Sequence, residues 1–345
     1  MNIALGSSEP ARFRQFTRLI SLLLIFLVPN AVLAEGHDDA SLSGPPFSTP
    51  DHTEHMEDGW HSKAIKYEKV PEGTDISITL DQHLYPALLP IINDYGKAQG
   101  IKIAVKEGTC GISAGSLLDK RVDIAGFCCP PGETDRLPGV KFHTLGISAV
   151  AFFTHPDNPV KGLTIKQARD IYRGNIGQWN RITPLAQGLA GNQVEPVARL
   201  HCKARPGHWR LLLDNEDMFS VSLFEVSAIE DMLTTVASNP KAIGYESVWM
   251  TKRYAKVAPV KLIAINGAMP TERAALISGR YPIYRTYNIT SWSGEAVHNE
   301  RADALIEHIQ RNIGAVDPDF VIIPAAVLRR AGWRFDGDEL VGEPR

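Results

Sequence analysis

The spacing of apolar and polar residues predicts a chain in which strands and helices alternate. Ile76–Leu80 alternates like a strand, and Tyr85–Gln99 repeats apolar residues at helical spacing. Ile101–Val105 is a second predicted strand, followed by a helix from about Ser113 and a buried strand from Val122. Because such a series is typical of βαβ units, we expect an α/β fold with a parallel sheet and helices on its faces.

The same alternation continues after residue 140. Thr164 is a suitable cap for one further helix, and Gly174 is suited to end it. We expect strands over Val140–Phe153, Val194–Leu200 and Val260–Ile265, a short strand after the turn at Ser238, and helices over Ile165–Tyr172, Leu211–Phe219, Ala228–Ala237 and Ala302–Ile313. The length of 345 residues indicates about two domains. A net charge of −3 gives no reason to expect a nucleic-acid partner.

The N-terminus has the pattern of a secretory signal. Arg12, Arg14 and Arg18 precede the apolar run Leu19–Val28, and Val32–Ala34 offers a cleavage site. The run is shorter than the roughly 20 residues that a membrane-spanning helix needs. We therefore expect residues 1–34 to be removed on export to the periplasm, an oxidising compartment in which cysteines often form disulfides.

Residues 35–65 are predicted to be a disordered leader. Residues 35–61 contain seven acidic residues, three prolines and no Lys or Arg, so they have little apolar surface to bury. His52 and His55, beside Asp51 and Met56, offer a loose transition-metal site. The simpler interpretation is a solvated acidic tail with incidental histidines.

Three of the four cysteines lie in two loops that a parallel sheet would bring together. Cys110 lies in a Gly-rich loop that opens a helix, and Cys128 and Cys129 follow the strand that begins at Val122. In parallel sheets, ligands bind at the carboxyl ends of the strands, and a helix start offers free backbone N–H groups to anions. The fourth cysteine, Cys202, follows much later in the chain.

Several motifs, in order and spacing over about residues 75–325, resemble those of the periplasmic phosphate-binding proteins of ABC transporters. They are Asp157–Val160 with Leu163 and Thr164, Ile171–Ile176 with Trp179, Ser238–Tyr245, and Tyr281–Ile283 with Arg285. The resemblance implies the two-lobed α/β fold of type 2 periplasmic-binding proteins, in which each lobe is a mixed, mostly parallel sheet flanked by helices and the ligand lies in the cleft between the lobes. Residues 66–152 with 264–345 would form the first lobe, and residues 153–263 the second.

The ligand loops depart from the pattern of that family. The serine of the family's Gly-Ser-Gly loop falls on Cys110, and its Ser-Ser-Arg-Pro loop falls on Phe127–Pro130. The Ser-Gly-Thr that the family carries after an Arg is missing after Arg199. Thiols are poor hydrogen-bond donors, and Cys129 replaces a guanidinium, so we expect poor phosphate binding. Thiolate and imidazole instead suit a soft transition metal, an iron–sulfur cluster or a thiophilic metalloid.

The sequence thus predicts a solute-binding protein, without enzymatic activity, whose site is rebuilt for a soft ligand. The expected ligand-binding residues are Thr109, Cys110, Gly111, Cys128, Cys129, His201, Cys202 and His208, with the four cysteines and His201 as metal ligands. The expected partners are a small inorganic ligand and either an ABC permease or a membrane sensor kinase, and we expect a monomer. Two alternatives stay open: an oxyanion-binding transport protein with structural disulfides, and a periplasmic thiol redox protein.

Overall fold

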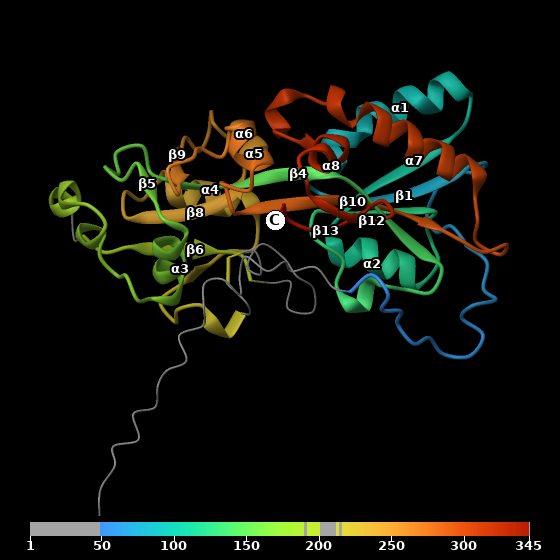
Figure 1. Ribbon diagram of the computed structural model, residues 1–345, viewed down its shortest axis with the longest axis horizontal. Coiled ribbons are helices and arrows are strands. Elements are labelled where there is room, and N and C mark those ends of the chain that lie inside the picture. The colour runs from blue at the N-terminus through green and yellow to red at the C-terminus, as the bar shows by residue number, and fades with distance from the viewer. Residues whose placement is uncertain (1–48, 190–191, 201–211, 214–215, 345) are drawn as a thin grey trace, which may run out of the picture. The chain divides into compact units, whose positions relative to one another are not determined.

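A mixed sheet forms the centre of the protein, and two antiparallel strands at its middle join two parallel sets (Figure 1). The computed structural model describes residues 49–189, 192–200, 212–213 and 216–344. The central strands are β4 (Val140–Thr154) and β10 (Tyr284–Trp292), which pair along most of their length. The strand order is β2-β1-β3-β10-β4-β8-β6-β7, so β10 and β4 separate the two parallel sets.

The first parallel set is built from the first three described strands of the chain. It contains β1 (Ile76–Asp81), β2 (Ile103–Gly108) and β3 (Ile124–Phe127), and β1 pairs with both others. Its helices are α1 (Tyr85–Gln99), α2 (Cys110–Leu118) and α7 (Glu300–Asn312). Helices α1 and α7 lie together over one face of these strands, and α2 lies on the other (Figure 1). This arrangement confirms the predicted βαβ series.

The second parallel set lies on the other side of β4. Its strands are β8 (Ala242–Ser247), β6 (Glu195–Ala198) and β7 (Phe224–Glu225). Besides α7, the helices that follow β4 along the chain are α3 (Ile165–Arg173), α4 (Ile229–Ala237), α5 (Val248–Arg253), α6 (Arg273–Ile277) and α8 (Ala325–Arg330). The remaining strands are β5 (Gly162–Leu163), β9 (Lys261–Ile265), β11 (Ile323–Pro324), β12 (Arg334–Asp336) and β13 (Glu339–Gly342).

Most predicted elements are confirmed, and the differences have physical reasons. Helix α2 begins at Cys110 rather than Ser113, because the Thr109 side chain caps it by accepting a hydrogen bond from the Ile112 amide at 3.3 Å. The long strand β10 was not predicted. In the predicted helix Leu211–Phe219, residues 211, 214 and 215 lie outside the described residues; none of the others is α-helical, and Glu216–Met218 form a single 3-10 turn.

The segment before β1 packs on the first parallel set. Trp60 is buried, and its indole N–H donates to the Leu118 carbonyl at 2.8 Å. The Lys120 ammonium lies 4.2 Å from the centre of the Trp60 ring and donates to the carbonyls of His61 and Lys63 at 3.2 and 2.7 Å. The sequence places these residues in a disordered leader ending at 65. The described residues from 49 onward instead contact the folded part, because an indole has enough apolar surface to hold them there.

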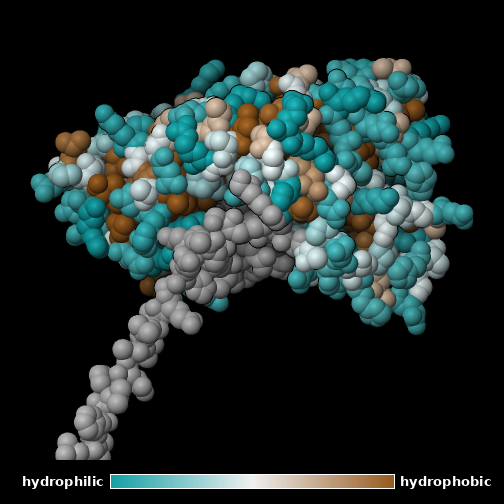
Figure 2. Space-filling model, viewed as in Figure 1, coloured by the Kyte–Doolittle hydropathy of each residue, from teal (hydrophilic) through white to brown (hydrophobic). Residues whose placement is uncertain are grey.

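The surface of the described residues is mostly polar. In the view of Figure 2, hydrophilic residues dominate over the outer helices, with apolar residues scattered among them. The exposed large hydrophobic side chains are Ile112, Leu118, Leu185, Val221, Phe224 and Val257. Among the described residues, no helix combines the length and the apolar character that crossing a membrane requires.

Candidate functional site

Three loops meet at the carboxyl edge of the first parallel set. Strand β1 ends at Asp81, β2 leads into Cys110, and β3 leads into Cys128 and Cys129. Because β1, β2 and β3 run parallel, their carboxyl ends lie at one edge of the sheet. The prediction that the two cysteine loops come together is therefore confirmed.

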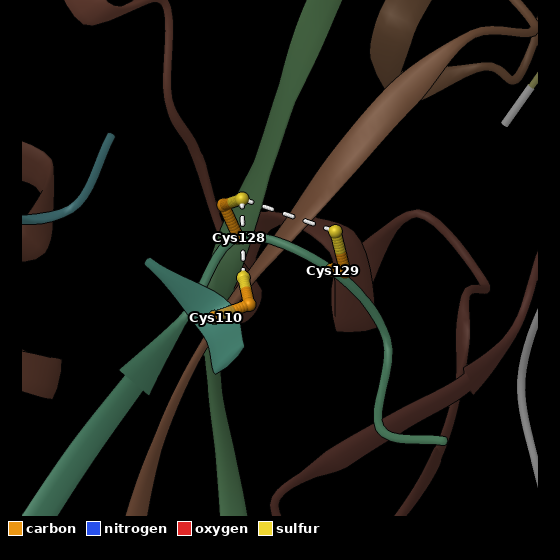
Figure 3. Close-up of side chains that lie close together, drawn as sticks. All are labelled: Cys110, Cys128 and Cys129. Atoms are coloured by element: carbon orange, nitrogen blue, oxygen red, sulfur yellow. Dashed lines mark hydrogen bonds between the residues drawn. The ribbon is translucent and has the colours of Figure 1, made fainter. Parts of the chain in front are cut away.

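The three cysteines form one buried cluster, with Cys128 in the middle (Figure 3). Cys128 Sγ lies 3.6 Å from Cys110 Sγ and 3.8 Å from Cys129 Sγ. All three sulfurs lie within 4.8 Å of one another. The cysteines are free thiols with exposed fractions of 8% or less. We call Cys110, Cys128 and Cys129 the thiol cluster.

The three thiols of the cluster differ in the direction in which their pKa is shifted. Hydrogen bonds from Cys110 and then Cys129, with a further contribution from His83, hold the pKa of the Cys128 thiol well below its usual range despite burial. The hydrogen bond to Cys128, the one to Cys129 and burial raise the pKa of Cys110. For Cys129, the hydrogen bond with Cys110 lowers the pKa, but the one with Cys128 and burial outweigh it and raise it overall. Among the three thiols, Cys128 is therefore the one whose thiolate form is most favoured, and a thiolate is the form that binds metals.

A buried histidine links the cluster to two carboxylates. His83 Nδ1 lies 2.9 Å from Asp81 Oδ1, and His83 Nε2 lies 2.9 Å from Glu246 Oε1. An ionised carboxylate only accepts hydrogen bonds, so both ring nitrogens can donate to these two oxygens when the ring is an imidazolium. Burial and Arg285 lower the pKa of His83, but Glu246, Asp81 and Cys128 together raise it well above its usual value.

Two arginines and one backbone amide surround the Glu246 carboxylate at the same site. Arg285 Nη2 donates to Glu246 Oε1 at 2.7 Å, and Arg199 Nη1 lies 3.5 Å from Glu246 Oε2. The backbone N–H of Ser247 also donates to Glu246, at 2.7 Å. Arg285 Nη1 in turn lies 3.6 Å from Cys128 Sγ. Buried charges persist only when they are paired and hydrogen-bonded, which this network provides.

The predicted site residues divide into three groups. Cys110, Cys128 and Cys129 come together, whereas Thr109 caps α2 with its side chain and Gly111 is exposed in the first turn of that helix. His201, Cys202 and His208 lie outside the described residues.

Four buried residues of the site were missed: Asp81, His83, Glu246 and Arg285. Asp81 ends β1 and His83 follows it, much as the cysteines follow β2 and β3, so the parallel-strand rule that placed the cysteines also applies to them. The sequence carries no comparable signal for Glu246. Arg285 appeared only within a family motif.

A comparison with models of known protein families identifies the family of this chain. A model of the PBP superfamily domain matches residues 66–310. The chain belongs to this superfamily. Comparison with curated proteins found no match to this sequence.

Two solved structures share the fold of this chain. One, described as a phosphate ABC transporter substrate-binding protein with bound phosphate from Clostridium perfringens, is 18% identical with a TM-score of 0.60, and the match covers 72% of this chain and 99% of that one. An ABC-type phosphate transport receptor from Vibrio cholerae is 18% identical with a TM-score of 0.54, and the match covers 70% of this chain and 96% of that one. This likeness confirms the predicted type 2 periplasmic-binding-protein fold, and at such identity it establishes the fold alone.

Proposed function

We propose that this PBP superfamily member is a solute-binding protein that holds a soft metal ion through the thiol cluster. The observation that carries the proposal is the spacing of the sulfurs. Metal–sulfur bonds of about 2.3 Å at tetrahedral angles place two sulfurs about 3.8 Å apart. The two sulfur–sulfur separations from Cys128 are 3.6 and 3.8 Å, so a metal fits the cluster with little rearrangement.

The two similar solved structures are described as binding or transporting phosphate. The charged groups at the site of this chain argue against such a ligand. Asp81 and Glu246 place carboxylates at the site, and Cys128 adds a thiolate. These groups repel an oxyanion, and the positive groups of the site, His83, Arg199 and Arg285, are already engaged by the two carboxylates. A soft cation instead gains bonds to thiolate sulfur, which an oxyanion cannot form.

A thiol redox function is the second candidate, and the lowered pKa of Cys128 beside two further thiols favours it. Thiol–disulfide exchange requires a thiolate that can reach the partner's disulfide. The three thiols are at most 8% exposed, which hinders such an attack. Metal binding needs only the entry of a small ion, so we favour it. An iron–sulfur cluster would need four thiolates and therefore also Cys202.

The cellular setting follows from the sequence and the family. We propose export to the periplasm with cleavage after residue 34, binding as a monomer, and delivery of the ion to an ABC permease or presentation to a membrane sensor kinase. Binding and release, rather than catalysis, would be the whole activity of the chain.

Calorimetry on reduced, metal-free protein tests the proposed function. We expect Zn²⁺ or Cu⁺ to bind with one ion per chain and inorganic phosphate to bind poorly. Cys128→Ser should abolish high-affinity metal binding, because it removes the sulfur that contacts both others. Tight phosphate binding together with no metal binding by the wild type would overturn the proposal.

A further inference from the structure

The carboxylate of Asp81 is held with one oxygen turned toward the thiol cluster. Its Oδ1 accepts hydrogen bonds from the backbone N–H of His83 at 2.8 Å and from the His83 ring at 2.9 Å. Its Oδ2 accepts from the Cys110 thiol at 3.6 Å. Asp81 is 2% exposed, so water does not compete for this second oxygen. The side chain is therefore both buried and oriented.

The distance between Asp81 and Cys110 matches that of a four-coordinate centre with three sulfurs and one oxygen. Metal–oxygen bonds of about 2.1 Å and metal–sulfur bonds of about 2.3 Å at tetrahedral angles give a sulfur–oxygen separation of about 3.6 Å. The separation between Asp81 Oδ2 and Cys110 Sγ has this value. An oxygen of Asp81 also lies within 4.8 Å of Cys128 Sγ, but no single Asp81 oxygen is within that distance of all three sulfurs, so coordination would need the carboxylate or Cys129 to shift by about 1 Å or more.

We infer that Asp81 is the fourth ligand of the site and that the bound ion is a borderline divalent cation of the Zn²⁺ type. This inference rests on the proposed function. A carboxylate is a hard ligand, and it adds little for Cu⁺, which thiolates alone satisfy. For Zn²⁺ it completes the tetrahedral set of four that structural sites of this ion use. Asp81 thereby favours Zn²⁺ over Cu⁺ at the site.

His83 positions Asp81 and does not itself bind the ion. Both of its ring nitrogens are engaged, one by Asp81 and one by Glu246. Glu246 is fixed in turn by Arg285 at 2.7 Å. Hydrogen bonds of this kind orient metal ligands, and their loss typically lowers metal affinity about 10–100-fold.

Asp81→Asn in the full mature chain tests the inference, with Zn²⁺ and Cu⁺ as probes in separate chelator competitions. The amide keeps the shape of the side chain but is a poor ligand. We expect Zn²⁺ affinity to fall by about 100-fold or more and Cu⁺ affinity to change by less than about threefold. Asp123→Asn is the matched control: it removes another buried carboxylate, at the far end of β3 and roughly 16 Å from Cys128 along the strand, and should leave both affinities unchanged.

A second variant keeps the test valid if Asp81→Asn fails to fold. In Asp81→Cys, the charge-transfer bands of bound Co²⁺ should show a fourth thiolate, because the new sulfur replaces the oxygen ligand. A band intensity unchanged from the wild type would overturn the role of Asp81. Equal losses of Zn²⁺ and Cu⁺ affinity in Asp81→Asn would also overturn it. If the wild type binds none of these ions, the proposed function itself fails, so the two failures are distinguishable.

Discussion

Arg285 contacts Cys128 and Glu246 at the same time. One guanidinium nitrogen lies 3.6 Å from Cys128 Sγ, and the other donates to Glu246 Oε1 at 2.7 Å. Arg285 lies on β10, whereas Glu246 lies on β8 in the second parallel set and Cys128 follows β3 in the first. A single buried side chain therefore connects Cys128 of the thiol cluster to the opposite half of the sheet.

Removing that guanidinium should destabilise the fold. In Arg285→Met, Glu246 keeps a buried charge with less compensation, which costs about 3–5 kcal/mol of unfolding free energy. Urea denaturation measures the loss. The double variant Arg285→Met, Glu246→Leu should recover part of it, because no carboxylate is then left uncompensated. A double variant less stable than Arg285→Met would show that the pair is not coupled in this way.

Zn²⁺ binding should strengthen steeply with pH. Thiols must lose their protons to coordinate, and the raised pKa values of Cys110 and Cys129 keep these two protonated near neutral pH. Cys128, with its lowered pKa, already has the binding form. Two protons are therefore released, and affinity should rise about 100-fold per pH unit around neutrality. A dependence near tenfold per unit would mean that one of these thiols does not bind the ion.

Trp60→Ala should reduce stability although it lies before the first strand. The indole is 7% exposed and is held by Leu118 and Lys120, so its loss should cost about 3 kcal/mol in urea denaturation. His55→Ala, at an exposed position of the same segment, is the control and should change stability by no more than about 0.5 kcal/mol. Equal effects of the two substitutions would contradict the docked position of Trp60.

The sequence was most informative about residues that lie at the ends of neighbouring parallel strands. Cys110 and Cys128 are 18 positions apart, and the rule for parallel strands places both at one sheet edge. His83 and Glu246 are 163 positions apart, and nothing local indicates that they meet. Strand β10 escaped prediction because all nine of its residues are buried although five of them are polar, so its sequence shows neither regular alternation nor an apolar run. The network of Glu246 and Arg285 depends on that strand, so it was missed with it.

X-ray absorption at the zinc edge of the Zn²⁺-loaded protein tests the central claim most directly, because it reports the atoms bound to the ion. The thiol cluster with Asp81 predicts three sulfurs at about 2.3 Å and one oxygen at about 2.0–2.2 Å. The Cys128→Ser variant should lose this sulfur shell. A wild-type spectrum with only nitrogen and oxygen neighbours would contradict a metal site in the thiol cluster.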